Sequence, residues 1–530
     1  MSPIETLVAL VAATVALALL ARAAQVPSAV ALVLGGMGVA LVPGVPAIDL
    51  DPHVALALFL PPLLQASAYR TDWAAFRLAL RPILLLALGA VLFTTGSIAI
   101  AIKLLVPGLP WAAAIALGAI VAPPDAVAAT SVLKTMRLPR NLVTVLEGES
   151  LLNDASSLIL YRFAVTAAVA GTASLSAGDA AWSFFASSAG GTLVGYAVGR
   201  LIIAATRLLN DTLLEITAIV LAGFVGYIVA EQLGLSGVLA AVACGLVIGR
   251  AQHEVLSART RVESTAVWNF LEFTLTSLVF ILIGLQLREV LGRLGDYSLG
   301  TLVGMGVAMS ATLIVSRFVW VFASSTLGRL APARFHVGGA RMPTSHLIIV
   351  SWAGMRGVVS LAASLALPLG FPGRDLIIFL AFCAILVTLV LQGTTLGWVI
   401  TRLHVSEVAE EAATAREAGV RRAAAEAALA TMERRLFEGR TLGMPDRDML
   451  HEFRRRAEDA RQQETGPSLA GRRREARLQL ELDAIHAARR AVLDHAHALD
   501  SQQLQAIEEE YDFEEGRLTR ALHDATGGRG

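Results

Sequence analysis

The sequence predicts an all-α polytopic membrane protein with thirteen transmembrane helices and a soluble helical C-terminal domain. Apolar runs of about 20 residues, the length that crosses a bilayer as a helix, recur from the N-terminus to about Arg402. The mean hydropathy is +0.64, and only 16% of the residues are charged. After Arg402 the composition changes abruptly, which predicts a transmembrane domain over residues 1–404 and a separate tail over residues 405–530.

The expected spans follow one another with short connections. They cover roughly residues 4–21, 26–43, 53–69, 83–105, 111–131, 143–170, 181–204, 213–231, 235–249, 266–287, 299–327, 346–369 and 376–402. No basic segment precedes the first span, and the second follows at once, so a cleaved signal peptide is not expected. Because the number of spans is odd, the two termini should lie on opposite sides of the membrane.

The distribution of basic residues selects the orientation. One set of loops carries Arg22, Arg70, Arg77, Arg81, Lys134, Arg137, Arg140, Arg200, Arg207, Arg250, Arg259, Arg261, Arg329, Arg334 and Arg341. The opposite set carries Lys103, Arg288, Arg293 and Arg374. Positively charged loops stay in the cytoplasm, so we expect the N-terminus outside and the C-terminus inside.

The tail is rich in Ala, Glu and Arg, contains no lysine, and has apolar positions at helical spacing. Glycine and proline at residues 439–445 and 466–467 divide it into three or four helices. Its arginine runs at residues 454–456 and 472–474 could contact anionic lipid, but a solvated face paired with Glu and Asp is the favoured interpretation.

Several classes of function have little support. Basic and acidic residues balance at 43 each, so nothing indicates nucleic-acid binding. Cys244 and Cys383 both lie in apolar spans and are expected to be buried free thiols. We find no nucleophile–base set, metal-ligand spacing or phosphate-binding loop, so neither an enzyme nor a cofactor is expected.

The segment Leu146–Arg162 has an unusual composition for a membrane span. It carries Glu147, Glu149, Asp154 and Arg162. Charged groups at membrane depth are costly and mark ion paths. Ser150 and Asp154, four residues apart, share a helix face and offer oxygen ligands to a cation. The segment therefore predicts an ion or proton site; a structural polar cluster between helices is the alternative.

Two other spans should be interrupted. In the fifth, Pro123 and Pro124 precede Asp125, and consecutive prolines break a helix in mid-membrane. The break would expose carbonyls that can bind ions, although a proline kink capped by Asp125 is the simpler interpretation. In the twelfth, Gly354 and Gly357 bracket Arg356. Interrupted spans seven apart predict two six-helix halves of opposite topology with a midplane site.

These motifs together resemble a family. Pro123-Pro124-Asp125-Ala-Val-Ala, Glu149-Ser-Leu-Leu-Asn-Asp154 and Trp352-Ala-Gly-Met-Arg-Gly357 resemble bacterial monovalent cation/proton antiporters of the CPA1 type, related to NhaP and NHE. Leu271-Glu-Phe, Phe280-Ile-Leu-Ile-Gly-Leu-Gln-Leu287 and Glu231-Gln-Leu-Gly-Leu-Ser-Gly237 are similar to the same family. The resemblance covers most of residues 1–404, and the tail has none that is useful.

The resemblance implies a role for each matching residue. Asp154 would bind the cation or a proton, and Ser150 with the backbone around Pro124 and Asp125 would help coordinate Na+. Asn153 would be the neutral neighbour that makes exchange electroneutral.

The same resemblance implies a buried Glu149–Arg356 ion pair joining spans six and twelve. It further implies an NhaA-like fold, a homodimer in the bacterial inner membrane surrounded by lipid, and a core domain that moves against a dimerisation domain.

Departures from the family pattern affect residues near the expected ion path. Many relatives place an acid after Pro61-Pro62-Leu-Leu, where this chain reads Gln65-Ala66. Thr276 stands where relatives often have Asn. Gln65, Thr276, Thr130 and the intramembrane Arg162 are therefore further contributors to consider. Arg162 could pair with a carboxylate or reach the membrane surface.

The expected mechanism is competition at Asp154 with alternating access, in which the site holds a proton or Na+ but never both. Exchange of K+ or Li+ for H+ is a close alternative. A cation channel and a membrane sensor acting through the tail are more distant ones, separable by whether flux requires a counter-ion and whether transport survives removal of residues 405–530.

Overall fold

The computed structural model describes most of the 530-residue chain. The described residues are 3–24, 26–40, 52–125, 129, 136, 138–170, 177–209, 211–286, 290, 292, 294, 297–330, 342–405, 419–420, 422–434, 453–455, 458, 469–494 and 501–525. The chain divides into two compact units, Met1–Ala409 and Glu410–Gly530.

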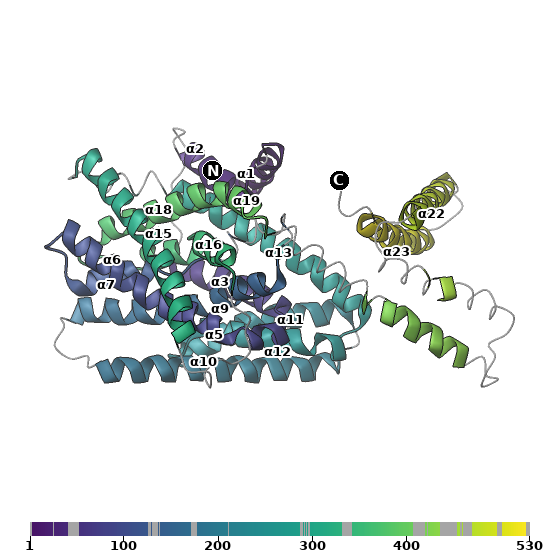
Figure 1. Cartoon of the computed structure of the whole chain (residues 1–530), viewed down its shortest axis with the longest axis horizontal. Helices are drawn as coiled ribbons and strands as arrows, with labels where there is room; N and C mark the ends of the chain where they lie inside the picture. The colour runs from purple at the N-terminus through teal and green to yellow at the C-terminus, as the bar shows by residue number, and fades with distance from the viewer. Residues whose placement is uncertain are drawn as a thin grey trace. The chain divides into compact units, whose positions relative to one another are not determined.

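The described elements of the first unit are helical (Figure 1). They are α1 (Pro3–Ala23), α2 (Ser28–Ala40), α3 (Pro52–Arg70), α4 (Trp73–Leu78), α5 (Leu80–Leu84), η1 (Leu85–Ala90), α6 (Val91–Leu105), α7 (Trp111–Val121), α9 (Arg140–Ala170), α10 (Ala177–Thr206), α11 (Thr212–Gln232), α12 (Gly237–Val255), α13 (Ala258–Leu285), α15 (Leu299–Leu330), α16 (Thr344–Trp352), α17 (Val358–Leu365), α18 (Arg374–Val387), η3 (Thr388–Gln392) and α19 (Gly393–Arg402). The π-helical segments η1 and η3 were not expected from the sequence.

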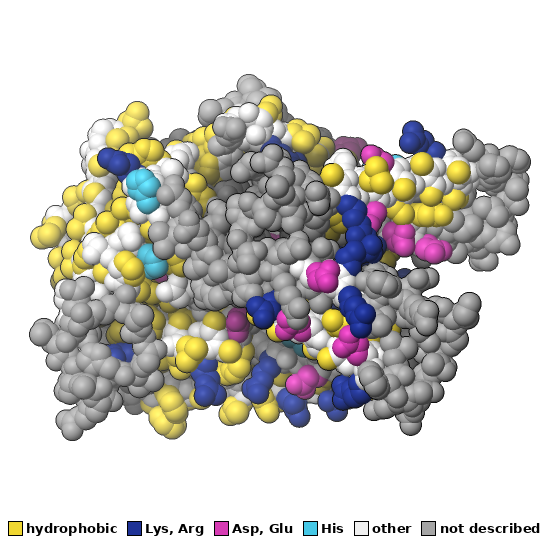
Figure 2. All heavy atoms as spheres, turned by 45° about the vertical axis from the view of Figure 1, so that its right-hand side comes forward, with side chains coloured by type: hydrophobic (Ala, Val, Ile, Leu, Met, Phe, Trp, Pro, Cys, Tyr) yellow, Lys and Arg dark blue, Asp and Glu magenta, His cyan; other side chains and the backbone are white. Residues whose placement is uncertain are grey.

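Within the described ranges, seven helices are long and apolar enough to cross a membrane. They are Leu80–Leu105, Trp182–Thr206, Thr212–Gln232, Gly237–Val255, Ala258–Leu285, Leu299–Thr326 and Arg374–Arg402. Figure 2 shows hydrophobic side chains spread over much of the described surface on one face, as expected for a surface that meets lipid. The structure is therefore an all-helical membrane protein.

Side-chain caps fix where several helices begin. Asp211 accepts a hydrogen bond from the backbone N–H of Leu214 at the start of α11, and Ser236 accepts one from Leu239 at the start of α12. Ser257 does the same for α13. These short polar side chains satisfy N–H groups that a helix leaves without an internal partner.

One group of helices, the scaffold bundle, comprises α1–α3 and α10–α13. Glycines allow its helices to approach closely: a Cβ atom on Gly195 of α10 would collide with the Ala240 carbonyl of α12, and one on Gly249 of α12 would collide with the Tyr69 carbonyl of α3. In Figure 1, α10 and α12 run side by side along the lower edge of the unit. Small residues at these positions let the helix backbones of this bundle pack directly against one another.

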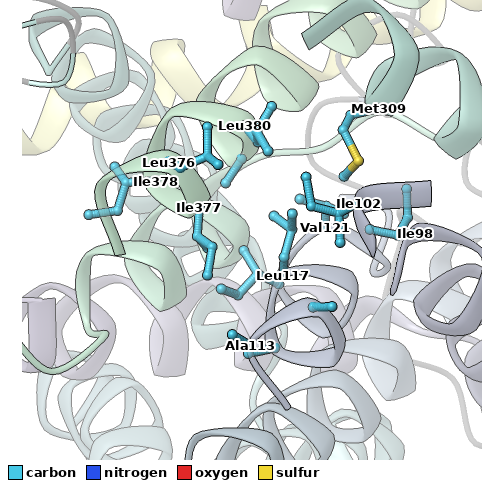
Figure 3. Packing of buried hydrophobic residues seen from close by; sticks show 14 of the residues in the cluster. Ile98, Ile102, Ala113, Leu117, Val121, Met309, Leu376, Ile377, Ile378 and Leu380 are labelled. Atoms are coloured by element: carbon cyan, nitrogen blue, oxygen red, sulfur yellow. The ribbon is translucent and has the colours of Figure 1, made fainter. Parts of the chain in front are cut away.

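The other group, the crossing bundle, comprises α4–α7 with η1, α9, α15–α19 and η3. Its apolar core is drawn in Figure 3, where Ile98 of α6, Leu117 of α7 and Ile377 of α18 lie together, all fully buried. Gly118 of α7 lies against the backbone of Thr95 in α6, which brings these two helices close.

The two bundles meet along α9. Leu151 and Ala155 of α9 pack in one apolar cluster with Leu60 of α3 and Val238 and Val242 of α12. This contact places the charged helix α9, which belongs to the crossing bundle, directly against the scaffold.

The second unit contains a helical pair, α22 (Leu469–Asp494) and α23 (Ser501–Ala525), which pack against each other. Leu518 of α23 is buried, and His486 Nε2 of α22 lies 3.3 Å from Glu515 Oε1 of α23.

Candidate functional site

Two helices are interrupted, and their breaks meet. α7 ends at Val121, just before the consecutive prolines, and α16 ends at Trp352 before α17 begins at Val358. Both interruptions lie where the sequence predicted them. The backbone N–H of Asp125 donates a hydrogen bond of 2.7 Å to the Met355 carbonyl, so the non-helical segments are bonded directly to each other.

Arg356 fills the gap between the ends of these helices. Its Nε donates to the Val121 carbonyl at 2.7 Å, and its Nη2 donates to the Ala122 carbonyl at 3.0 Å. Its Nη1 donates to the carbonyl of Gly354, just beyond α16. The last carbonyls of a helix have no internal partner and carry partial negative charge. One buried guanidinium thus binds carbonyls at the C-terminal end of α7 and in the segment just beyond α16.

Asp125 lies at the N-terminal end of α17. It belongs to the region where the two helix breaks meet, which is called the crossing below. A Cβ atom built on Gly357, the residue before α17, would overlap the carboxylate of Asp125. The carboxylate therefore lies against the N-terminus of α17, where the helix dipole favours negative charge. The charges of Arg356 and Asp125 are matched to the ends of the half-helices that they contact.

α9 is bonded to this crossing by side chains one turn apart. Asn153 Nδ2 donates to the Pro124 carbonyl at 2.9 Å, and Ser157 Oγ donates to the Ala119 carbonyl at 2.7 Å. Asp154, next to Asn153, is only 7% exposed. Among the described residues, the buried Asn153 Oδ1 has no hydrogen-bond partner, so a polar oxygen is left available beside the carboxylate.

The structure thus brings together Pro124, Asp125, Asn153 and Asp154. Asp125 is near enough for its carboxylate to interact electrostatically with that of Asp154. Ser150 lies one turn before Asp154 on α9 and is partly buried. Thr130 lies outside the described residues. Two carboxyl groups, an amide oxygen and backbone carbonyls form a set of hard oxygen donors suited to a small cation.

The prediction of a Glu149–Arg356 ion pair is wrong, because Glu149 has a different cationic partner. Glu149 instead pairs with Arg317 of α15 through two parallel bonds, of 2.7 and 2.9 Å, and both side chains are almost fully buried. Arg317 Nε also donates to the Val350 carbonyl of α16. Arg356 already uses its guanidinium on the carbonyls at the crossing, which explains why another arginine serves Glu149.

Two further candidates, Gln65 and Thr276, lie on helices of the scaffold bundle. Gln65 is fully buried, but its Nε2 donates to the Ile219 carbonyl at 2.6 Å and its Oε1 accepts from Gly223 N–H at 3.1 Å. Both ends of this amide therefore bind α3 to α11 within the scaffold bundle. Thr276 of α13 has a buried hydroxyl without a hydrogen-bond partner among the described residues.

Arg162 makes a bidentate contact with Glu231 of α11, at 2.9 and 2.7 Å, and half of its side chain is exposed.

Arg317 and Thr388 were not predicted from the sequence. Arg317 is an arginine inside an otherwise apolar span, the same signal that singled out Arg356. Thr388 Oγ1 accepts a 3.1 Å hydrogen bond from the backbone N–H of Arg356 and begins η3. π-Helical turns often occur at functional sites, but this one leaves no pattern in the sequence.

Comparison with known proteins identifies the family of the segment that contains these residues. The family model described as "Sodium/hydrogen exchanger, transmembrane" matches residues 8–402, about three quarters of the chain. The chain belongs to the sodium/hydrogen exchanger family. Members of this family are transporters.

Individual relatives agree with this assignment. The exchanger is 34% identical over 408 residues to an uncharacterised Na+/H+ exchanger of Mycobacterium tuberculosis, covering 74% of this chain and 73% of the relative. It is 34% identical over 366 residues to a sodium, potassium, lithium and rubidium/H+ antiporter of Bacillus subtilis, covering 66% of this chain and 54% of that protein.

A solved structure shows the same fold. The sodium proton antiporter MjNhaP1 from Methanocaldococcus jannaschii superposes with a TM-score of 0.61 at 17% sequence identity. The match covers 76% of this chain and 98% of the archaeal protein.

Proposed function

We propose that the exchanger moves Na+ in one direction and H+ in the other across the bacterial inner membrane, by alternating access with competition at Asp154. The observation that carries this proposal is the placement of Asp154. It is buried on α9, at the point where α9 is bonded to the break before Asp125, and the neighbouring amide oxygen of Asn153 has no hydrogen-bond partner in the part of the chain that the structure describes.

Burial explains why exchange would be obligatory. A bare carboxylate in a low-dielectric interior is strongly unfavourable unless it is paired or neutralised. Asp154 can be neutralised by a proton or by a cation, and the two exclude each other at one carboxylate. Only the two neutralised forms would then pass through the closed intermediate, so each cation that crosses requires a proton to return.

We expect the exchange to be electroneutral. The neighbour of Asp154 is the uncharged Asn153, whose amide is bonded to Pro124. One carboxylate that exchanges one proton for one monovalent cation moves no net charge. Na+ is the expected substrate, with K+ and Li+ as alternatives, because a relative of this chain is named for sodium, potassium, lithium and rubidium together.

The remaining features belong to the same proposal. We place thirteen helices in the membrane as two inverted repeats, with the N-terminus outside, because of the span count and the arginine distribution. The scaffold bundle would form a homodimer, and the crossing bundle would move against it. We assign residues 405–530 a regulatory role in the cytoplasm, and pH homeostasis to the whole protein.

The test is proton movement in proteoliposomes after addition of Na+, K+ or Li+, with the membrane potential clamped and unclamped. Wild type should exchange one of these cations for protons at a rate indifferent to potential. Asp154→Asn should abolish exchange while leaving the protein folded, and Asp375→Asn, which changes a half-exposed carboxylate at the start of α18, should not. Exchange retained by Asp154→Asn would remove that residue from its role.

A further inference from the structure

Two ion pairs of α9 differ in where they lie and in what breaking them costs. Glu149–Arg317 joins helices inside the crossing bundle, and its side chains are 2% and 3% exposed. Arg162–Glu231 joins α9 to α11 of the scaffold bundle, and its side chains are 50% and 30% exposed. Separating the first pair would strand buried charges, whereas the second pair lies at the end of α11 and is already partly exposed, so its separation buries no charge.

Arg162 continues the face of α9 that meets the scaffold. Leu151, Ala155, Leu158 and Arg162 follow one another at intervals of four, three and four residues, which places them on one side of a helix. Leu151, Ala155 and Leu158 pack in the apolar cluster that contains Val238 and Val242 of α12. We call this apolar contact between α9 and α12 the seam. It includes Ala155, next to Asp154, and Arg162 follows its last residue on the same face of α9.

Glu231 is held by its own bundle. Its Oε1 accepts a hydrogen bond of 3.2 Å from the backbone N–H of Gly237 at the start of α12. The turn between α11 and α12 is fixed by Leu235 N–H, which donates to the Ala230 carbonyl, and by Gly234, whose φ of 71° suits glycine. If the bundles part, Glu231 keeps this partner and stays in place, while Arg162 leaves with α9.

We propose that Arg162 and Glu231 form a releasable latch, which holds the seam between α9 and the scaffold closed in one of the two access states of the exchanger. A shift of α9 by one helical turn, about 5.4 Å, would move Arg162 out of reach of Glu231 and displace the apolar stripe. The inference rests on the proposed alternating access, and it adds the contact that sets the balance between the two states.

The strength of the contact suits such a role. A two- to fivefold change in an equilibrium corresponds to about 0.4 to 1 kcal/mol, at 1.4 kcal/mol per tenfold, which lies within the small contribution of partly exposed ion pairs. A latch of this strength biases the closed state without trapping it. Where the open state is the minor one, loss of the latch should lower the half-saturating cation concentration on the side of the membrane to which the open state gives access. The factor should be about the same two- to fivefold.

The experiment is a double-mutant cycle with Arg162→Gln, Glu231→Gln and both together. Gln at position 231 retains a side-chain oxygen for the Gly237 N–H. Seam opening is followed by a reporter, Leu158→Cys, in a chain with Cys244→Ala and Cys383→Ala, reacting with a membrane-impermeant maleimide. Exchange and half-saturating cation concentration are measured in proteoliposomes of the same cycle variants without the reporter.

Each single variant should react about two- to fivefold faster at the reporter, and the double variant no faster than either single, because the pair acts as one contact. The matched control is Arg70–Glu272, a 2.6 Å ion pair between α3 and α13 within the scaffold bundle. Arg70→Gln and Glu272→Gln should leave the reporter rate unchanged.

Three results would overturn the latch: unchanged labelling in both single variants, effects that multiply in the double variant, or an equal effect in the Arg70–Glu272 control. Wild-type exchange with any of these results rejects the latch alone. Absence of exchange in wild type rejects the proposed function, while the labelling cycle still reports whether the pair holds the seam.

Discussion

Loss of Arg317 should be among the most damaging single changes in the transmembrane unit. Arg317→Met removes two charge-assisted bonds to Glu149 and one bond to the Val350 carbonyl. It leaves Glu149, which is 2% exposed, as an unpaired charge in the interior. Breaking a buried ion pair from one side costs about 3 to 5 kcal/mol. We expect the free energy of unfolding to fall by that amount.

A double variant that also changes Glu149 separates the loss of the ion pair from the cost of leaving a buried charge without a partner. In Glu149→Gln/Arg317→Met no buried charge remains, so the double variant should recover about 2 kcal/mol or more relative to Arg317→Met alone. The assay is unfolding in mixed micelles titrated with a denaturing detergent. Arg70→Met is the control for an ion pair that is partly exposed, and it should cost about 1 kcal/mol or less.

Two outcomes would refute this reasoning. Arg317→Met could prove as stable as wild type, which would mean that Glu149 finds another partner or is not ionised. Alternatively, the double variant could prove no more stable than Arg317→Met, which would place the whole loss in packing and in the Val350 bond.

The other predictions concern glycine and glutamine positions. Gly357→Ala should reduce exchange at least about tenfold in the proteoliposome assay. The added methyl overlaps the carboxylate of Asp125, and overpacking costs about 1 to 3 kcal/mol. The control in the same assay is Gly397→Ala, where the methyl would make an ordinary contact. Gln65→Leu should lower the free energy of unfolding by about 1 to 3 kcal/mol, because it leaves the Ile219 and Gly223 backbone groups without this amide. It should leave the ratio of Na+- to K+-driven exchange unchanged; an altered ratio would make Gln65 part of the ion path.

The sequence was sufficient to locate the crossing because its signals are local. Consecutive prolines at residues 123–124 and glycines at 354 and 357 disrupt a helix wherever they occur, and α7, α16 and α17 end or begin beside them. The expectation that α9 carries a polar face likewise needed only helical periodicity and the cost of charge in a membrane.

Pairing could not be predicted in the same way. The composition of α9 shows that Glu149 needs a cation, but Arg317 and Arg356 are equally buried arginines in other spans, and only the packing of α15 against α16 decides between them. The binding partners of Gln65 could not be predicted for a similar reason. An amide in mid-membrane signals that something is bound, and here the bound groups are the backbone of α11.

Arg356 has a consequence for the thermodynamics of exchange. Because one guanidinium binds both the end of α7 and the Gly354 carbonyl just beyond α16, a shift of either segment alone would break some of these bonds. The ligands around Asp154 would then travel as a fixed set, and the intrinsic affinity for the cation would be the same whichever compartment the site faces. The two directions of exchange would then saturate at similar cation concentrations. As in any exchanger that uses no other energy source, the direction of net transport would follow the ratio of the two ion gradients.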